Sequence, residues 1–343
     1  MKFKNVVIES FAYDISSEIV TSIQIEERLA PLYQRLKLPE GRLELMTGII
    51  SRRQWPTGTK PSDLSSAAAK KLFLNSKIKK DEIDLLIHAS VCRDFLEPAT
   101  ASVVHANLEL SAHAMIFDLS NACLGVINAI VVAGNMIENG QIKSALIVSG
   151  ENGGPLIEGT IEKLLNDPLI DRKNIKKYIA NLTIGSAATA ILLTHKSLSP
   201  ESPQILGGSV QTDSSANHLC RGDGNTHSLV METDSEELLK YGVILAQSTW
   251  QKLKAELNWN NDTPQLVLTH QVGTAHEKLS LESLELTHKK TFRTYPTFGN
   301  TGSSALPITL MMASEAGALV KGDKVALLGI GSGLSSIMLG VQW

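Results

Sequence analysis

The sequence has few cysteines, no block of basic residues and no long uninterrupted apolar run. Its 343 residues contain only three cysteines, Cys92, Cys123 and Cys220, which are odd in number and widely spaced. This pattern argues against a disulfide framework and for a reducing compartment, which we expect to be the cytoplasm. The formal net charge of −3, with no cluster of lysine or arginine, argues against nucleic acid or an anionic membrane as the main partner.

The most apolar stretch, 122–137, is interrupted by Asn128 and Asn135 and is shorter than the ~18 apolar residues that a membrane span requires. It therefore predicts a helix buried inside the protein. The first residues lead into a short strand-like run and lack the apolar core and cleavage site of a signal peptide. We expect a protein with no membrane span, long enough to bury a large core in two domain-sized units.

The sequence contains one structural unit twice. Apolar strand-like segments at 84–87 and 145–148 recur at 265–268 and 326–329, and both pairs are separated by the same 181 residues. Two landmarks with one offset indicate an internal duplication. A further helix is predicted over 21–36 from its Thr-Ser start and its apolar spacing.

Each half carries one long apolar helix, predicted over 122–138 and 303–319 and closed by a glycine turn. Strands that are apolar on both faces and alternate with helices predict an α/β fold in which helices cover the sheets. The halves are predicted at 1–197 and 204–343, joined by the Pro- and Ser-rich linker 198–203. We expect them to stack in five layers, α/β/α/β/α, with both long helices in the middle.

Three reactive or polar side chains lie at boundaries of the predicted elements. Cys123 opens the first long helix, where unpaired N–H groups and the helix dipole favour a thiolate, although a lone cysteine is more often a core residue. His270 follows an apolar strand, and Asn300 lies in a Gly-Asn-Thr-Gly loop before the second helix. The repeat aligns Cys123 with Ser304, and a pseudo-twofold relation brings both helix starts to the centre. This combination indicates thioester chemistry.

These residues, the duplication and the closing Gly-Ile-Gly-Ser-Gly at 329–333 resemble thiolase-fold condensing enzymes of the β-ketoacyl synthase III type. Within that group, Arg-Asp-Phe-Leu-Glu-Pro at 93–98 and Leu-Cys-Arg-Gly at 219–222 resemble the OleA type, which condenses two long acyl-CoA molecules head to head in olefin biosynthesis. The resemblance extends to Trp343. It implies a thiolase fold, a homodimer, acyl-CoA substrates without a separate cofactor, and downstream enzymes of an olefin pathway as partners.

Three features depart from the ordinary synthase III pattern, at four positions. Arg42 and Met46 occupy the places of a tryptophan and an arginine that grip CoA, which leaves the CoA contacts unassigned. Ala275 replaces a basic residue that docks the acyl carrier protein, and Glu97 replaces a phenylalanine that reaches into the partner's pocket. All three changes disfavour malonyl-carrier protein as the carbon donor.

The resemblance implies a role for each candidate residue. Cys123 attacks the first acyl-CoA and holds its acyl group as a thioester, while the amides of Cys123 and Ser332 form the oxyanion hole. His270 and Asn300 bind the carbonyl of the second acyl group and stabilise its enolate. Glu97, buried in an acyl tunnel of the partner subunit with a raised pKa, removes the α-proton. Hydrolysis then releases a 2-alkyl-3-oxo acid and free CoA.

Four other interpretations remain open. A synthase III that uses acyl-CoA and malonyl-carrier protein is disfavoured by Ala275 and Glu97. A degradative thiolase needs a second cysteine where this chain has Ser332. An enzyme similar to HMG-CoA synthase also combines a cysteine, a histidine and a glutamate. An inactive partner subunit would have lost the nucleophile, whereas Cys123 is present.

A polar segment over 213–237 predicts a long loop above the site. It contains His218, Cys220 and His227, which could ligate a metal ion. Nothing supplies a well-spaced fourth ligand, so we predict no metal site.

Overall fold

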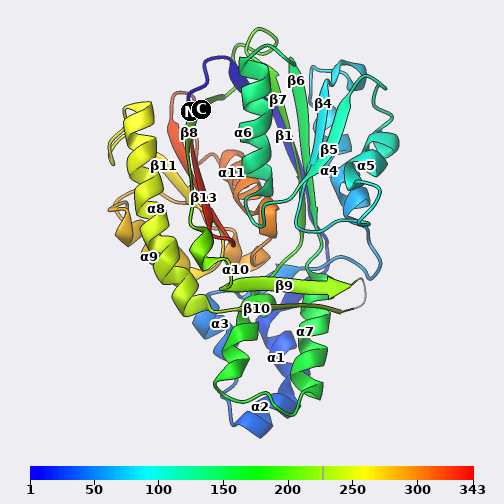
Figure 1. Ribbon diagram of the computed structural model, residues 1–343, viewed down its shortest axis with the longest axis vertical. Helices are drawn as coiled ribbons and strands as arrows, with labels where there is room; N and C mark the ends of the chain where they lie inside the picture. The colour runs from blue at the N-terminus through cyan, green and yellow to red at the C-terminus, as the bar shows by residue number, and fades with distance from the viewer. Residues whose placement is uncertain (226–227) are drawn as a thin grey trace.

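The computed structural model describes residues 1–225 and 228–343 and contains two related halves (Figure 1). Five strands of the first half pair in the order β1-β7-β6-β4-β5, and four strands of the second half in the order β8-β13-β12-β11. The first four strands of the first series correspond, in order, to the four strands of the second series. β5 is an additional strand at the edge of the first series. Their bounds are β1 (Val6–Asp14), β4 (Leu85–Ala89), β5 (Met115–Leu119), β6 (Ser144–Glu151), β7 (Ala187–His195), β8 (Gln204–Thr212), β11 (Leu266–Thr269), β12 (Lys324–Gly331) and β13 (Ser335–Gln342).

The predicted five-layer α/β/α/β/α arrangement is confirmed by the apolar cores. The largest core contains residues of both strand series and of α6 and α11, which therefore lie between them. A second core lies under α4 and α5 on the outer face of the first half, and another under α8 and α9 on the second. These helices are α4 (Pro61–Phe73), α5 (Thr100–Leu108), α6 (Gly125–Glu138), α8 (Ser235–Leu257), α9 (Thr274–Ser283) and α11 (Ala305–Glu315).

The two halves contact each other through more than the central helices. β1 and β8 pair at a single position, Val7 with Gln204, which joins the two series edge to edge. The first residues of the chain lie against the second half, where the Phe3 N–H donates to the Leu206 carbonyl. The segment between β7 and β8 contains the predicted linker. The division at 197 and 204 remains a prediction about how the chain is organised.

A smaller lobe lies below the strand ends in Figure 1 and has an apolar core of its own. It was not predicted, because its pieces come from three separate parts of the sequence. The lobe and its hairpin close one side of a space at the carboxyl ends of the strands. Their elements are β2 (Ile19–Thr21), α1 (Ser22–Arg28), α2 (Ala30–Leu36), α3 (Arg42–Thr47), β3 (Ser51–Arg53), α7 (Gly154–Asn166), the 3-10 helix η2 (Asn174–Thr183), β9 (Cys220–Asn225) and β10 (Ser228–Thr233).

The predicted helix over 21–36 is two helices. Thr21 caps α1 with a reciprocal capping box, as its sequence suggests. Leu29 then ends α1 and begins α2, because Pro31 lacks an N–H and disfavours helical backbone before it.

The prediction of a long loop over 213–237 is wrong. The segment forms the 3-10 turn η3 (Ser214–Ala216), the antiparallel hairpin β9–β10 and the start of α8. Its polar composition reflects a hairpin that lies over a cavity instead of in a core. His227 lies outside the described residues.

The two central helices begin later than predicted, at Gly125 and Ala305, because tight turns precede both. The turn before α11 is the 3-10 helix η4 (Gly302–Ser304), which follows the short helix α10 (Tyr295–Phe298). The remaining element is the 3-10 turn η1 (Lys80–Glu82). Within the described ranges, no helix combines the length and apolar character needed to cross a bilayer.

Candidate active site

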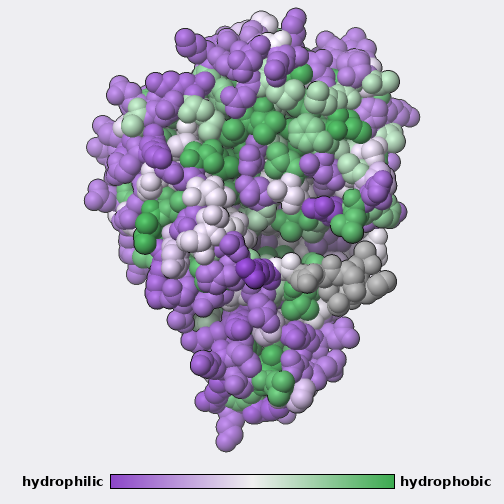
Figure 2. All heavy atoms as spheres, in the orientation of Figure 1, coloured by the Kyte–Doolittle hydropathy of each residue, from purple (hydrophilic) through white to green (hydrophobic). Residues whose placement is uncertain are grey.

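A cavity of about 1200 Å³ lies between the strand ends and the lobe, and Figure 2 shows the surface hollowed above the hairpin. Cys123, His270, Asn300 and Ser332 all line it. They come from both halves, at the carboxyl ends of strands or in the loops that precede the central helices. This is the usual place for a ligand site in an α/β sheet. The structure therefore brings together four of the five predicted site residues.

Cys123 lies in a tight turn just before α6. Ala122 has φ of 45°, in the left-handed region that non-glycine residues avoid, and the Leu124 N–H donates to the Asn121 carbonyl at 2.9 Å. Gly125 packs so closely that a Cβ there would lie 3.3 Å from the Ala89 carbonyl oxygen. Strained backbone of this kind persists only where the surroundings hold it, and here it fixes the thiol toward the cavity.

Burial raises the pKa of the Cys123 thiol to about 12, with the charge of Glu151 and the neighbouring Cys220 thiol adding to the effect. The Cys123 backbone N–H and the Asn300 side chain favour the thiolate but do not offset burial. This direction opposes the thiolate that a helix start favours, and the state of Cys123 during attack stays a prediction. The residue is half-buried, yet the loss of hydration at its thiol and the nearby Glu151 carboxylate outweigh the effect of the helix start.

His270 is the first residue after β11, and its backbone N–H donates to the Leu328 carbonyl at 3.0 Å. Burial lowers the pKa of its imidazole to about 4, and the nearby His276 contributes to the shift. Within the described part of the chain, neither ring nitrogen has a hydrogen-bond partner. A neutral imidazole with free nitrogens can accept a proton at one and donate a hydrogen bond from the other.

Asn300 is fixed by backbone hydrogen bonds across the two halves. Its N–H donates to the Thr183 carbonyl at 2.9 Å, and its carbonyl accepts from the Gly185 N–H at 2.8 Å. Its side-chain oxygen accepts from the Gly302 N–H at 3.1 Å, which leaves the amide N–H₂ for Cys123 or a substrate carbonyl. Gly185 is required here, since a Cβ would lie 1.8 Å from the Phe298 carbonyl oxygen.

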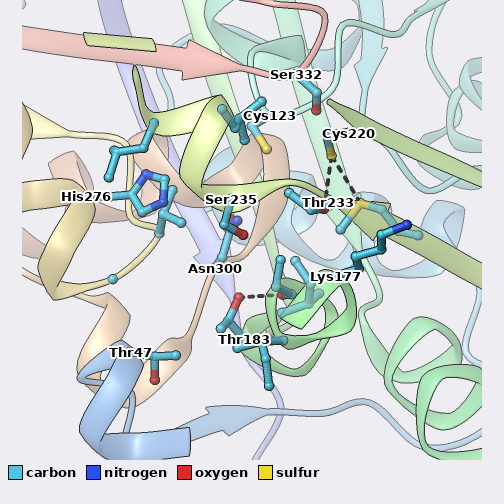
Figure 3. Close-up of a pocket in the computed structure, with 18 of the residues that line it drawn as sticks. Thr47, Cys123, Lys177, Thr183, Cys220, Thr233, Ser235, His276, Asn300 and Ser332 are labelled. Atoms are coloured by element: carbon cyan, nitrogen blue, oxygen red, sulfur yellow. Dashed lines mark hydrogen bonds between the residues drawn. The ribbon is translucent and has the colours of Figure 1, made fainter. Parts of the chain in front are cut away.

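Ser332 lies on the loop after β12, and Figure 3 shows it beside Cys123. The backbone of this loop approaches the nucleophile closely, because a Cβ on Gly331 would lie 3.6 Å from the Cys123 nitrogen. The two amides predicted to form an oxyanion hole thus lie on adjacent segments. Their role remains a prediction.

Glu97 is the predicted site residue that one chain does not bring to the cavity. It lies on the exposed segment 91–97 after β4, which we call the arm, and its side chain does not line the cavity. The expected burial of Glu97 in an acyl tunnel is therefore not found within one chain. Leu96 beside it is 93% exposed, which is unusual for a leucine.

Sequence reasoning missed Glu151, which ends β6, is buried and also lines the cavity. An acid at the end of an apolar strand was the available signal. Cys92 lines the cavity as well, and burial with the charge of Glu151 raises the pKa of its thiol well above the usual value. Cys220 contacts the Met231 sulfur at 3.6 Å and the Thr233 hydroxyl at 3.4 Å.

In the described ranges, no group of three or more histidine, cysteine or acidic residues is arranged to hold a metal ion. The possible ligand His227 lies outside these ranges. The absence of a metal site therefore remains a prediction.

Four basic side chains lie around the cavity entrance. Lys176 and Lys177 are engaged in ion pairs with Glu236 and Glu232, at 3.0 and 3.4 Å. Arg42 and Lys173 line the same entrance, and neither side chain has an ion-pair partner among the described residues. These two cations are available to an anionic ligand.

Comparison with known proteins agrees with this geometry. The family model of 3-oxoacyl-[acyl-carrier-protein] synthase III matches residues 117–214, and the model of its C-terminal part matches 255–343. The acyl-CoA:acyl-CoA alkyltransferase of Shewanella oneidensis is 40% identical over 351 residues, which cover 100% of both chains. The chain belongs to the acyl-CoA:acyl-CoA alkyltransferase family. The alkyltransferase of Xanthomonas campestris is 38% identical, again over 100% of both chains.

Solved structures of this alkyltransferase family have the same fold. A cysteine-to-alanine variant of Xanthomonas campestris OleA superposes with a TM-score of 0.95 at 38% identity, covering 100% of this chain and 98% of that one. A cysteine-to-serine variant with lauric acid and lauroyl-CoA bound superposes with a TM-score of 0.94. The β-ketoacyl synthase III of Clostridium tetani is more distant, at 27% identity over 86% of this chain.

Proposed function

We propose that this protein condenses two long-chain acyl-CoA molecules without decarboxylation, giving a 2-alkyl-3-oxo acid and two molecules of free CoA. The observation that carries the proposal is one cavity that joins Cys123, His270 and Asn300 in a chain of the alkyltransferase family. The synthase III alternative is less favoured, because the Clostridium tetani synthase III shares only 27% identity and Ala275 lacks the charge that would dock a carrier protein.

The first half-reaction transfers an acyl group to Cys123. Because the thiol is neutral at working pH, the neutral His270 imidazole takes its proton as sulfur attacks the thioester carbonyl. The amides of Cys123 and Ser332 stabilise the oxyanion. The carbon–sulfur bond to CoA then breaks, and the CoA thiolate recovers the proton.

The second half-reaction forms the carbon–carbon bond. The carbonyl of a second acyl-CoA accepts hydrogen bonds from His270 and from the Asn300 amide, which makes its α-proton more acidic. Glu97 of the partner subunit removes that proton, and the α-carbon attacks the acyl-Cys123 carbonyl and displaces the Cys123 thiolate, which then takes up the proton from Glu97. Water then hydrolyses the remaining CoA thioester.

Several features support a homodimer in which the arm of each subunit enters the partner's cavity. Among the described strands, the edge strand β5 pairs only with β4; Leu96 is almost fully exposed, and Figure 2 shows apolar surface over α6. Solved variants of Xanthomonas OleA replace a cysteine and a glutamate that are separated by the same number of residues as Cys123 and Glu97. We place the dimer in the cytoplasm, where acyl-CoA is present and where downstream enzymes of an olefin pathway would receive the acid.

The entrance supports CoA binding without a further cofactor. Arg42 and Lys173 supply positive charge where the phosphates of CoA would lie, while the apolar interior accepts the acyl chains.

The test is free CoA release from purified protein supplied with one long acyl-CoA and nothing else, with mass spectrometry of the products. The proposal expects two CoA for each 2-alkyl-3-oxo acid or its decarboxylated ketone. Silence with acyl-CoA alone, followed by turnover on addition of malonyl-carrier protein, would assign the chain to the synthase III class.

The shared site is tested separately with mixed subunits. A Cys123→Ala subunit retains Glu97, and a Glu97→Ala subunit retains the nucleophile, so neither homodimer should condense acyl-CoA. Random mixing makes half of the dimers mixed, with one complete site of two, which predicts about one quarter of wild-type activity. Activity of the Glu97→Ala homodimer equal to wild type would refute the role of the arm.

A further inference from the structure

A second carboxylate lies in the cavity, and the half-reactions above give it no role. Glu151 ends β6, the strand between β4 and β7, and it is 3% exposed. It lines the cavity together with Cys123. A buried acid in this place acts either as a base or as a support for other groups.

The hydrogen bonds of Glu151 decide between these two roles. Its Oε1 accepts from the Val91 N–H at 2.9 Å, the Ser303 N–H at 3.0 Å and the Ser303 hydroxyl at 2.6 Å. Its Oε2 accepts from the Cys92 N–H at 3.2 Å. Three of these donors converge on Oε1 and one on Oε2, and three of the four are backbone N–H groups of two separate segments, which is the arrangement of a support. Glu151 is therefore a support.

The two segments that Glu151 joins carry different parts of the chemistry. Val91 and Cys92 form the base of the arm, which carries Glu97 six residues after Val91. Ser303 belongs to the Asn300 loop, and its hydroxyl also lies 2.8 Å from the Ala89 carbonyl at the end of β4. The packing is close, since a Cβ on Gly302 would lie 3.0 Å from the Glu151 carboxyl carbon.

We propose that Glu151 is a positioning residue that fixes the arm and the Asn300 loop relative to each other. One carboxylate then aligns the Asn300 loop in the site of its own subunit. It also aligns the arm that carries Glu97 into the partner's site. The inference rests on the proposed function, because it requires the arm to act in the partner's cavity.

Mixed dimers separate the two effects. In the Cys123→Ala subunit, the only part that still contributes to catalysis is the arm that enters the partner's cavity. Glu151→Gln in this subunit replaces one carboxylate oxygen by an amide N–H₂. That N–H₂ then faces at least one backbone N–H whose hydrogen bond the carboxylate had accepted. We expect condensation to slow by about tenfold or more, while the burst of CoA from acylation of the other subunit is unchanged. In the Glu97→Ala subunit the same change displaces Asn300, and the acylation burst slows as well.

The charge of Glu151 affects the pH dependence of Cys123 alkylation, and a purely structural role of Glu151 would not change that pH dependence. Its removal lowers the pKa of Cys123, so Glu151→Gln should shift alkylation of this thiol by iodoacetamide to lower pH. Glu151→Asp keeps the charge and should leave that pH profile in place while it slows condensation. His270 and Cys220, which also face the cavity, are unchanged in both variants.

Glu9 supplies a matched control outside the site. Its carboxylate accepts from the Ser76 hydroxyl at 2.8 Å and the Lys77 N–H at 2.9 Å, and none of these three residues lines the cavity. Glu9→Gln should leave both half-reactions unchanged. If Glu151→Gln does not fold, Ser303→Ala removes one of the donors and tests the same link.

Two results would overturn the inference and are distinguishable. One is an active mixed dimer in which Glu151→Gln, in either subunit, slows condensation no more than Glu9→Gln does. That result refutes the positioning role of Glu151 and leaves the shared site intact. A mixed dimer without activity refutes the shared site of the proposed function, and the inference with it.

Discussion

The raised pKa of the Cys123 thiol determines how the acylation step proceeds. Burial raises the pKa of Cys123 to about 12 and lowers that of His270 to about 4, so the pair begins as thiol and neutral base. Proton transfer from sulfur to imidazole must then accompany attack on the thioester. A histidine without a partner among the described residues is suited to this step, because no hydrogen bond has to break before it accepts the proton.

The role of His270 predicts the acid limit of acylation. The imidazole is a base only above its pKa, and burial lowers that pKa from the ordinary 6.5 to about 4. The CoA burst should therefore hold constant from pH 8 down to about pH 5 and fall only as the pH approaches 4. Stopped-flow measurement of the burst across this range checks the prediction, and a loss of activity centred near pH 6.5 would contradict it.

The role of Cys123 is tested against another thiol of the same cavity. Cys123→Ala should abolish the CoA burst with little change in melting temperature, because the change removes a single sulfur atom. Cys220→Ala alters a thiol that contacts Met231 and Thr233 and should retain the burst. A Cys123→Ala protein that still releases CoA would refute the acyl-enzyme.

Sequence patterns pointed to four residues that the structure places in the cavity lining, for a physical reason. Cys123, His270, Asn300 and Ser332 each lie next to an apolar strand or helix, so a polar residue there stands out. Glu151 has the same signal, at the end of an apolar strand, but the sequence analysis did not single it out. Its burial results from contacts with Ser303, 152 positions away, which one sequence does not reveal.

At the scale of elements, the site depends on close contacts between loops of opposite halves. The Asn300 loop runs beside residues 183–185 and is bonded to them through backbone groups. Glycines at 185 and 299 make room for this approach; a Cβ on Gly299 would lie 2.5 Å from the Thr183 carbonyl oxygen. The glycines indicated these turns in the sequence. The bends before α6 and α11 were not predicted, and both helices therefore start later than expected.

Gly185→Ala should destabilise the protein and displace Asn300. Its Cβ would lie 1.8 Å from the Phe298 carbonyl oxygen, so the backbone must move, at a cost of about 2–4 kcal/mol in the free energy of unfolding. Gly222→Ala in the hairpin makes only an ordinary contact, 3.8 Å from Met231, and should change stability by less than ~0.5 kcal/mol. Denaturant unfolding of the two variants checks the difference, and equal stabilities would contradict it.

At the scale of the whole molecule, the fold follows from duplication and hydrophobic pattern. Strands that are apolar on both faces require cover on both sides, and two repeated halves share one central pair of helices. The lobe could not be predicted in this way. Its core is assembled from segments as distant as Ile25, Leu43 and Ile161, none of which shows a repeat or a motif.

Dimerisation should depend on the exposed arm. Leu96 is 93% exposed in one chain, and burying it in a partner contributes ~1.5–3 kcal/mol for each of two symmetric copies. Leu96→Ser should therefore raise the dimer dissociation constant by roughly two orders of magnitude or more. Leu74→Ser, at a leucine that is 83% exposed away from the arm, should leave it unchanged. Sedimentation of both variants checks this, and identical dissociation constants would count against an interface at the arm.

The most direct test of the account is a competition between the two possible carbon donors. The protein is given a long acyl-CoA labelled with carbon-13 at its carbonyl, together with unlabelled malonyl-carrier protein, and the products are analysed by mass spectrometry. Condensation of two acyl-CoA molecules predicts a 3-oxo acid with two labels, or a ketone with one after loss of labelled CO2. A singly labelled 3-oxoacyl product extended by two carbons would contradict the account.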